Sequence, residues 1–174
     1  MKGRLFLAVG NSASGKDSVI SYALRGIPTL KKLKRVITRP ESDTEDFISI
    51  KKEDFKAEDY FISWESYNKF YGIPKNILDG LEKGEDYIVN VSRQVITEIK
   101  NKWNNTFVIL FQVPIEILKQ RLSNRGREDN KEIKQRLERA SDAPRIKADL
   151  IIDSSNPDVS IAGEELIKFI KLQK

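Results

Sequence analysis

The chain has 174 residues and a formal net charge of +5, and it contains neither cysteine nor histidine. The lack of cysteine excludes disulfides and thiolate metal sites, and the lack of histidine removes the commonest general base and zinc ligand. Apolar residues make up 39% of the chain and charged residues 33%, which predicts one folded domain over residues 1–174. Any chemistry must use carboxylates, lysine, arginine, hydroxyl groups or bound metal.

No apolar run approaches the ~20 residues of a membrane helix. The chain start, MKGRLFLAVGN, reaches its glycine too soon for a secretory signal, so we expect a cytoplasmic location and no membrane partner. The positive charge suits anionic partners, but the basic residues of 119–139 alternate with acidic ones at helical spacing. We therefore expect small phosphorylated molecules and no nucleic acid as partners, and a monomer or homodimer.

The first third of the chain predicts a strand, a loop and a helix, followed by a second strand and an insertion. The apolar run 4–10 ends at a glycine and predicts the strand, and 16–26 has helical spacing. A second strand is expected at 33–38, before an Arg-Pro pair. Short strand-like runs with one short helix over about 38–75 predict an inserted, partly antiparallel subdomain.

The remainder alternates strands with helices. The near-continuous apolar runs at 86–92 and 106–113 are typical of strands buried on both faces of a parallel sheet. A last strand is expected at 148–153, and helices at 74–84, 93–103, 114–126, 129–143 and 157–172. This alternation predicts an α/β sandwich with a central parallel sheet, built from right-handed βαβ units.

The stretch GNSASGKDS, residues 10–18, has the spacing of a phosphate-binding loop. A glycine-rich turn between a buried strand and a helix directs backbone N–H groups at one point, where the helix dipole adds positive potential. Lys16 follows the second glycine and can reach the β and γ phosphates of a nucleotide. We expect these residues to bind the donor nucleotide: Gly10, Asn11, Ser12, Ala13, Ser14, Gly15, Lys16, Asp17 and Ser18. A purely structural glycine turn is the alternative.

Asp17 stands where such a loop normally has serine or threonine holding magnesium. A carboxylate beside a triphosphate would repel it unless a divalent cation lay between them, so Asp17 is a candidate Mg²⁺ ligand, directly or through water. Ser18 can supply a hydroxyl, one position later. The alternative is that Asp17 only stabilises the first turn of its helix, by about 0.3–1 kcal/mol.

With this loop, the segments RVITRP, YGIP, IVNVSR and NRGRE with RLERA resemble the guanylate-kinase-like branch of the P-loop kinases. Within that branch the chain is most similar to the ribose 1,5-bisphosphate phosphokinase family, from Leu5 to about Asp153. The resemblance implies a three-layer P-loop kinase sandwich with a small acceptor-binding subdomain at about 38–75 and a helical lid at about 121–142. It also implies ATP and Mg²⁺ as cofactors.

The departures from guanylate kinases favour a different acceptor. A guanine-reading glutamate is replaced by Ser63, and Ile73 follows Tyr-Gly where those kinases have a hydroxyl. A site lacking both polar groups is poorly equipped to select guanine. Where guanylate kinases have an acidic strand end, this chain has Asn90, Ser92 and Arg93, which makes the pocket more positive. The alternative for Arg93 is a solvent-exposed start of the next helix.

The resemblance further implies the residues of the acceptor site and the lid. The expected lid carries Arg121, Arg125, Arg127 and Arg136. Catalytic roles fall on Lys16, Arg125 and Arg136, although any lid arginine could instead pair with a glutamate on a solvated helix face. The expected acceptor-binding residues are Arg39, Glu45, Tyr71, Asn90, Ser92, Arg93 and Arg127.

The activity that the resemblance implies is transfer of a phosphoryl group from ATP to the 1-phosphate of ribose 1,5-bisphosphate, giving 5-phosphoribosyl 1-diphosphate and ADP. The main alternative is a nucleoside monophosphate kinase of the guanylate type. A non-catalytic module is a further alternative, but it would tolerate a broken phosphate loop, and this loop keeps Gly10, Gly15 and Lys16. A nucleic-acid-binding NTPase would show affinity that falls steeply with salt.

Overall fold

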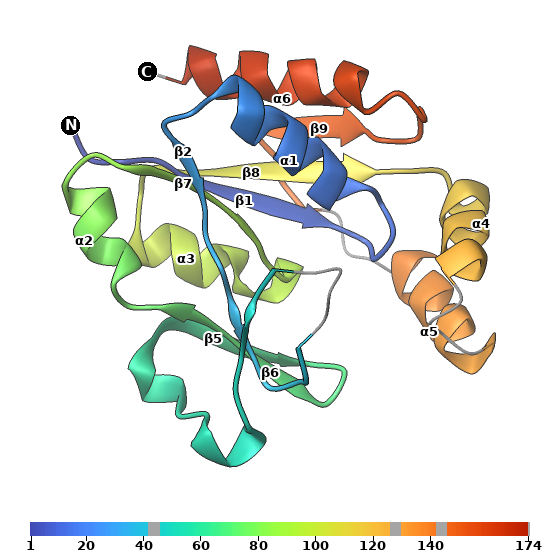
Figure 1. Cartoon of the computed structure of the whole chain (residues 1–174), viewed down its shortest axis with the longest axis horizontal. Helices are drawn as coiled ribbons and strands as arrows, with labels where there is room; N and C mark the ends of the chain where they lie inside the picture. The colour runs from blue at the N-terminus through green and yellow to red at the C-terminus, as the bar shows by residue number, and fades with distance from the viewer. Residues whose placement is uncertain (42–45, 126–129, 142–145, 174) are drawn as a thin grey trace. The chain divides into compact units, whose positions relative to one another are not determined.

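Strand β1, Leu5–Gly10, forms because LFLAV is a continuous apolar run, and these five side chains are buried. The computed structural model describes residues 1–41, 46–125, 130–141 and 146–173 (Figure 1). Their strands form a five-stranded sheet in the order β2-β7-β1-β8-β9 and a four-stranded sheet in the order β4-β3-β6-β5. The predicted α/β class with a central parallel sheet is confirmed.

The five-stranded sheet contains, besides β1, the strands β2 (Leu30–Lys32), β7 (Asp86–Asn90), β8 (Thr106–Gln112) and β9 (Leu150–Asp153). The four-stranded sheet contains β3 (Val36–Ile37), β4 (Ile48–Ser49), β5 (Tyr60–Ser66) and β6 (Lys69–Pro74). The helices are α1 (Lys16–Gly26), α2 (Ile77–Glu82), α3 (Ile96–Lys102), α4 (Ile115–Arg125), α5 (Asn130–Ser141) and α6 (Val159–Leu172). Short 3-10 helices are η1 (Lys52–Asp54), η2 (Ala57–Asp59) and η3 (Arg93–Val95).

Contacts divide the chain into two compact units. The first comprises residues 1–7 and 29–107, and the second comprises residues 8–28 and 108–174. The expected inserted subdomain falls in the first unit and the expected lid in the second. The single-domain organisation and its internal boundaries stay predictions.

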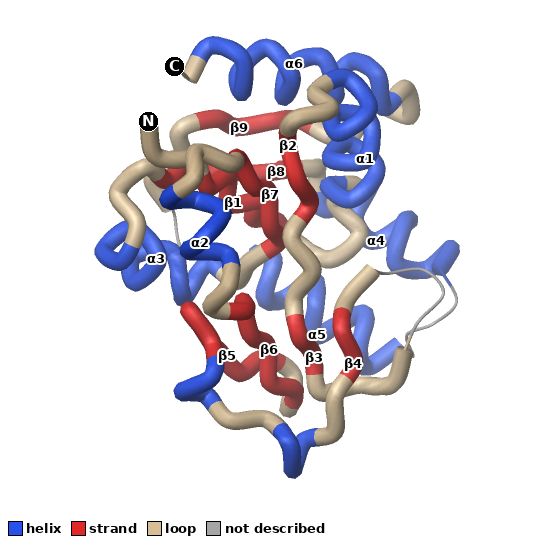
Figure 2. Tube along the Cα trace, turned by 60° about the vertical axis from the view of Figure 1, so that its left-hand side comes forward, coloured by secondary structure: helices blue, strands red, loops and turns tan. Residues whose placement is uncertain are grey.

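The strand expected at 33–38 is wrong as one element. Residues Leu30–Lys32 pair in parallel with β7, whereas Val36 and Ile37 pair antiparallel with β6. The chain therefore leaves one sheet and enters the other across residues 33–35 (Figure 2). Strand pairing partners, which local sequence does not encode, determine this division.

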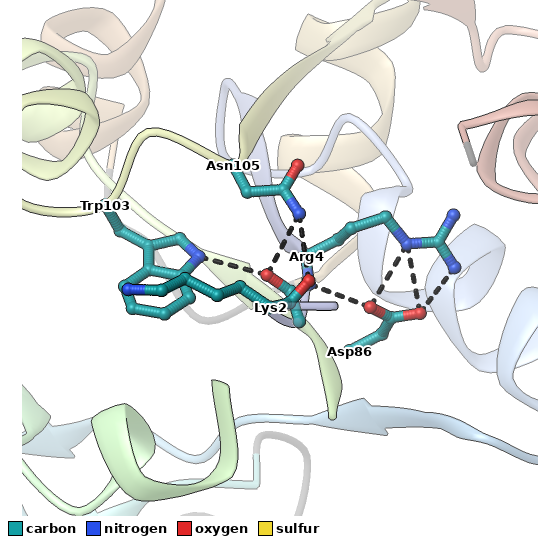
Figure 3. Close-up of polar contacts among 6 residues, drawn as sticks. Lys2, Arg4, Asp86, Trp103 and Asn105 are labelled. Atoms are coloured by element: carbon teal, nitrogen blue, oxygen red, sulfur yellow. Dashed lines mark hydrogen bonds and ion pairs between the residues drawn. The ribbon is translucent and has the colours of Figure 1, made fainter. Parts of the chain in front are cut away.

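Polar contacts hold the chain start within the first unit (Figure 3). Arg4 donates its backbone N–H to Asp86 Oδ1 at 2.8 Å and pairs through its guanidinium with both carboxylate oxygens. Trp103 Nε1 donates to the Gly3 carbonyl at 3.1 Å, and Asn105 Nδ2 donates to the same carbonyl at 3.2 Å. These contacts fix the residues just before β1 against the start of β7.

In the second unit, α1 packs against α6, and α6 packs against β9 (Figure 1). Strand β9 pairs in parallel with β8, from Ile109 opposite Leu150 to Gln112 opposite Asp153. Asp158 caps α6, because its carboxylate accepts from the Ser160 N–H at 2.9 Å. Helix α4 contacts α5. No helix within the described residues combines the length and apolar character needed to span a membrane.

Candidate active site

The loop between β1 and α1 has the backbone geometry that its two glycines allow. Gly15 has φ 85° and ψ 3°, a left-handed conformation that favours glycine, and it is the N-cap of α1. A Cβ on Gly10 would lie 2.7 Å from the Phe111 carbonyl oxygen, so only glycine fits there. The expected strand, loop and helix are therefore confirmed, and residues 10–18 form one continuous segment.

The start of α1 presents positive potential to this loop. Gly15 has no side-chain cap, and the N–H groups of Ser18 and Val19 donate to its carbonyl at 3.1 and 3.2 Å. The earlier N–H groups of a helix have no intrahelical acceptor, so they are available to an anion. Lys16 Nζ donates to the Asn11 carbonyl at 3.3 Å, which places the ammonium over the loop.

Asp17 and Ser18 lie in the first turn of α1, and both side chains are exposed. Among the described residues, no group of three or more acidic side chains gathers in a way that could hold a metal ion. A magnesium ion here would take oxygen ligands from Asp17 or Ser18 and the rest from phosphates and water, the usual arrangement for Mg²⁺ with nucleotides. The donor atoms of this turn fit that ion.

Ser14 is the buried centre of the loop. Its side chain is 1% exposed, and its Oγ has no hydrogen-bond partner among the described residues. Its carbonyl accepts from Ser154 Oγ at 2.6 Å and from Arg121 Nη1 at 3.2 Å. Hydrogen bonds to the Ser14 carbonyl thus fix the loop to Ser154, which follows β9, and to Arg121 on α4.

The structure brings two expected lid arginines to the loop, Arg121 through the Ser14 carbonyl and Arg136 through a side chain. Arg136 on α5 donates from Nη1 to Ser12 Oγ. Arg125 is the last residue of α4, and its side chain is outside the part of the chain that the structure describes. Arg127 also lies outside the described residues.

A cavity of about 390 Å³ adjoins the phosphate loop. Gly15 and Ser18 line it on the loop side, and the apolar side chains of Val19, Val159 and Ala162 line it further on. The amides of Asn124 and Asn156 also line the cavity, and amides both donate and accept hydrogen bonds. The size and mixed lining are those of a site for a small organic group such as a nucleobase.

The loop after β9 forms one wall of this cavity. The Ser155 N–H donates to Asp153 Oδ1 at 2.8 Å. Hydrogen bonds from the hydroxyl and backbone of Ser155 lower the pKa of the Asp153 carboxyl, with a smaller contribution from the charge of Arg121. The carboxylate therefore stays ionised and helps to fix the turn that leads to Asn156.

In the first unit, Tyr71 lies on one face of the four-stranded sheet. It pairs with Ile37 on β3 and with Trp64 on β5, and paired residues share a face. The Trp64 and Tyr71 rings are stacked, with centroids 5.3 Å apart and an interplanar angle of 6°. The guanidinium of Arg35 lies 5.6 Å from the Tyr71 centroid. Tyr71 thus contacts both an aromatic ring and a cation.

Arg39 follows β3, and its guanidinium lies 4.3 Å from the ring centroid of Phe47. The Arg39 carbonyl accepts from Ser49 Oγ on β4. Glu45, the expected acidic partner in this region, lies outside the described residues.

The end of β7 carries the remaining acceptor candidates. Asn90 is its last residue, Ser92 precedes η3 and Arg93 begins η3. Arg93 is half buried, which argues against the alternative that it is only a solvent-exposed residue at the start of a helix. Its Nε is buried without a hydrogen-bond partner among the described residues, and burial lowers the pKa of its guanidinium. Gln94 Nε2 donates to the Glu65 carbonyl at 3.0 Å, which ties η3 to β5 beside Trp64.

The two positions compared with guanine-reading residues differ in placement. Ile73 pairs with Ile62, is fully buried and shares a face with Tyr71. Ser63 pairs with Gly72 and therefore lies on the opposite face of the sheet from Tyr71. Ile73 is thus the position that removes a polar group from the Tyr71 face, and Ser63 does not contribute to that face.

Sequence reasoning missed the placement of Arg35, and it grouped Arg121 with phosphate-binding lid arginines. The only signal for Arg35 was its position in RVITRP, two residues before Ile37, since alternate residues of a strand share a face. Ser154 was missed as well, because its contact with Ser14 joins residues far apart in the sequence.

The fold and the loop define the class of protein. A solved guanylate kinase from Anaplasma phagocytophilum superimposes with a TM-score of 0.72 at 19% identity, covering 98% of this chain and 85% of that chain. The chain therefore has the guanylate-kinase-like fold, with a phosphate-binding loop between β1 and α1. No family model matches the sequence.

Curated relatives identify the family within that class. The ribose 1,5-bisphosphate phosphokinase PhnN of Acidiphilium cryptum is 37% identical over 165 residues, covering 92% of this chain and 90% of the relative. The protein of the same name from Thiobacillus denitrificans is 32% identical over 177 residues, covering 97% and 93%. The chain belongs to the ribose 1,5-bisphosphate phosphokinase family.

Proposed function

We propose that the protein is an ATP-dependent kinase acting on ribose 1,5-bisphosphate. An oxygen of the 1-phosphate attacks the γ-phosphorus of ATP, and the bond from that phosphorus to the β–γ bridging oxygen breaks. The products are 5-phosphoribosyl 1-diphosphate and ADP. The observation that carries the proposal is the cavity of about 390 Å³ that shares Gly15 and Ser18 with the phosphate loop, in a chain of this family.

The donor phosphates are bound by the backbone N–H groups of the loop and by Lys16. Arg136 contacts Ser12 of the same loop, so its guanidinium is near enough to stabilise negative charge that develops on the transferred group. Arg125 has the corresponding role by motif position. Mg²⁺ held by Asp17 or Ser18 would neutralise charge on the donor phosphates.

The acceptor is bound by residues of the first unit. Arg39, Tyr71, Asn90, Ser92 and Arg93 are the proposed ligands, and Arg35 joins them because it lies over the Tyr71 ring. Arginine suits this role, since its planar guanidinium can donate to two phosphate oxygens at once. Glu45 and Arg127 keep their expected acceptor-binding roles as predictions.

The reaction needs no general base from the protein. A phosphate oxygen is already anionic at neutral pH, and the chain has no histidine that could take a proton. The protein must instead reduce repulsion between two polyanions and align them, which are the positioning and charge effects that dominate phosphoryl transfer.

A nucleoside monophosphate kinase of the guanylate type is the second candidate, because the fold is that of a guanylate kinase. The buried, apolar Ile73 on the Tyr71 face argues against it, since selection of a base requires paired polar groups. Cytoplasmic location and a monomeric or homodimeric state stay predictions from the sequence.

The test is to supply Mg·ATP with ribose 1,5-bisphosphate, with GMP or with no acceptor, and to identify the products by anion-exchange chromatography and mass spectrometry. We expect 5-phosphoribosyl 1-diphosphate and ADP with the sugar bisphosphate only. Lys16→Met is the inactive control. Turnover with GMP and none with the sugar bisphosphate would replace this proposal by the second candidate.

A further inference from the structure

Arg121 connects two loops of the second unit through backbone carbonyls. Its Nη1 donates to the Ser14 carbonyl at 3.2 Å and, more weakly, to the Ala13 carbonyl at 3.5 Å. Its Nη2 donates to the Ser154 carbonyl at 2.8 Å and to the Ser155 carbonyl at 3.2 Å. One half-buried guanidinium therefore joins the phosphate loop to the loop that follows β9.

The Ser14 carbonyl has a second donor, because Ser154 Oγ reaches it at 2.6 Å. A peptide unit is planar and trans, so the Ser14 C=O and the Gly15 N–H point in opposite directions. Donors that fix the carbonyl therefore also fix the direction of the Gly15 N–H. The carbonyl faces α4 and β9, which leaves the N–H directed to the other side of the loop, where an anion binds.

The same side chains line the cavity. Arg121, Ser154 and Gly15 all belong to its wall, and a Cβ on Gly15 would lie 3.3 Å from Arg121 Nη1. The guanidinium thus forms part of the cavity wall and packs directly against the phosphate loop. This side chain therefore contacts both loops at once.

The contacts of Arg121 differ from those of a phosphate ligand. A guanidinium has four N–H donors on its two Nη atoms, and both Nη atoms of Arg121 are already bonded to carbonyls. Arg136, in contrast, contacts a side-chain hydroxyl at the edge of the loop. The contacts of Arg121 therefore suit a role in holding the backbone of the loop, whereas Arg136 lies where it can contact a bound phosphate.

We propose that Arg121 and Ser154 are positioning residues that orient the Ser14–Gly15 peptide for phosphate binding and couple it to the base cavity. The proposal rests on the proposed function in one respect, which is that a nucleoside triphosphate occupies the cavity and the loop together. It assigns Arg121 no direct contact with the transferred phosphoryl group.

The test measures binding without any acceptor. Isothermal titration calorimetry would be run with ATP, adenosine and tripolyphosphate on the wild type, Arg121→Gln, Arg121→Lys, Ser154→Ala and the Arg121→Gln/Ser154→Ala double variant. Lys119→Gln, an exposed position on the same helix, is the matched control. Far-UV circular dichroism and thermal unfolding establish that each variant is folded.

We expect Arg121→Gln to weaken ATP binding about 10- to 100-fold, the range for loss of hydrogen bonds from a charged donor. Adenosine and tripolyphosphate should both bind more weakly, and Arg121→Lys should restore part of the loss. The effects of Arg121→Gln and Ser154→Ala should be non-additive, because both act on the Ser14 carbonyl. The KM for the acceptor should stay unchanged.

Two results would overturn the inference. Weaker binding of tripolyphosphate with unchanged adenosine binding would make Arg121 a direct phosphate ligand. Unchanged affinity for all three ligands, with a lower melting temperature, would mean that Arg121 only stabilises the fold. If Arg121→Gln does not fold, Ser154→Ala tests the orientation of the Ser14 carbonyl independently. A wild type that binds no ATP would instead refute the proposed function, so the two failures are distinguishable.

Discussion

Trp64 and Tyr71 lie face to face across β5 and β6, with an interplanar angle of 6°. This stack fixes the Tyr71 ring, so its hydroxyl has a defined position on the face that also carries Arg35. Tyr71→Phe keeps the stack and removes only the hydroxyl. We expect the KM for ribose 1,5-bisphosphate to rise about 10-fold or more, the cost of one hydrogen bond to a charged group.

Steady-state kinetics with each substrate varied in turn measure this effect. The KM for ATP should not change, and the melting temperature should stay close to that of the wild type. Tyr67→Phe, at an exposed position in the turn between the same strands, is the matched control. An unchanged KM for the acceptor would remove Tyr71 from the substrate-binding residues.

Asp17→Asn should raise the Mg²⁺ concentration needed for half-maximal activity. The amide keeps the shape of the side chain but is a poorer ligand for a hard cation than a carboxylate. The measurement is initial rate against free Mg²⁺ at fixed ATP. If Asp17 only stabilises the first turn of α1, the magnesium dependence will not move and stability will fall by about 0.3–1 kcal/mol.

Arg136→Ala should lower kcat by about 100-fold or more, because preorganised donors near developing charge contribute on that scale. Helix α5 should remain folded, since arginine and alanine both favour helix. Lys134→Ala, an exposed position on the same helix, is the control and should keep its kcat. Equal losses in the two variants would show that the helix, and not the Arg136 charge, had been disturbed.

Asp86→Ala should destabilise the fold, because it leaves the Arg4 guanidinium and backbone N–H without their shared carboxylate. The two side chains are only 23% and 17% exposed, so the cost should be about 2–3 kcal/mol. Glu82→Ala breaks the exposed pair with Lys2 and should cost less than about 1 kcal/mol. Urea denaturation of both variants measures the difference.

The raised pKa of Tyr87 predicts that the free energy of unfolding falls at high pH. Burial and a hydrogen bond to Glu85 raise its pKa to about 12 from an ordinary value of 10.0. The folded state therefore keeps a proton that the unfolded state releases, so this stabilisation is complete below pH 10 and is lost as the pH rises from 10 to 12. In urea denaturation across this range, Tyr87→Phe should show a shallower decline than the wild type. Parallel declines would assign the loss to other groups.

The parts of the structure that depend on local sequence were predictable. Gly10 and Gly15 are required by a close approach and a left-handed backbone, and their spacing alone located the loop. The apolar runs predicted the strands β7 and β8, in which Ile88 and Val89 of β7 and most residues of β8 are buried.

The parts that depend on distant partners were not predictable. Residues 33–38 carry an apolar pattern, but within them only Val36 and Ile37 form a strand, which pairs with β6, while the strand that pairs with β7 lies earlier, at Leu30–Lys32. The contacts of Arg121 with Ser14 and Ser154 join three separate elements, and an arginine in a helix gives no indication that its acceptors are carbonyls. The same holds for Arg35 and the Tyr71 ring.

Within the described residues, strand β9 lies at one edge of its sheet, beside β8, and the Ser154–Ser155 segment follows it directly. Edge strands open locally at a lower free energy than the centre of a sheet, so their amides exchange with solvent sooner. Local opening of β9 would release the carbonyls of Ser154 and Ser155 while the rest of the sheet stays folded. If a bound nucleotide holds these carbonyls against Arg121, β9 opens less often and its amides exchange more slowly. Slower deuterium uptake at Ile151–Asp153 would therefore report nucleotide binding several residues away from any phosphate.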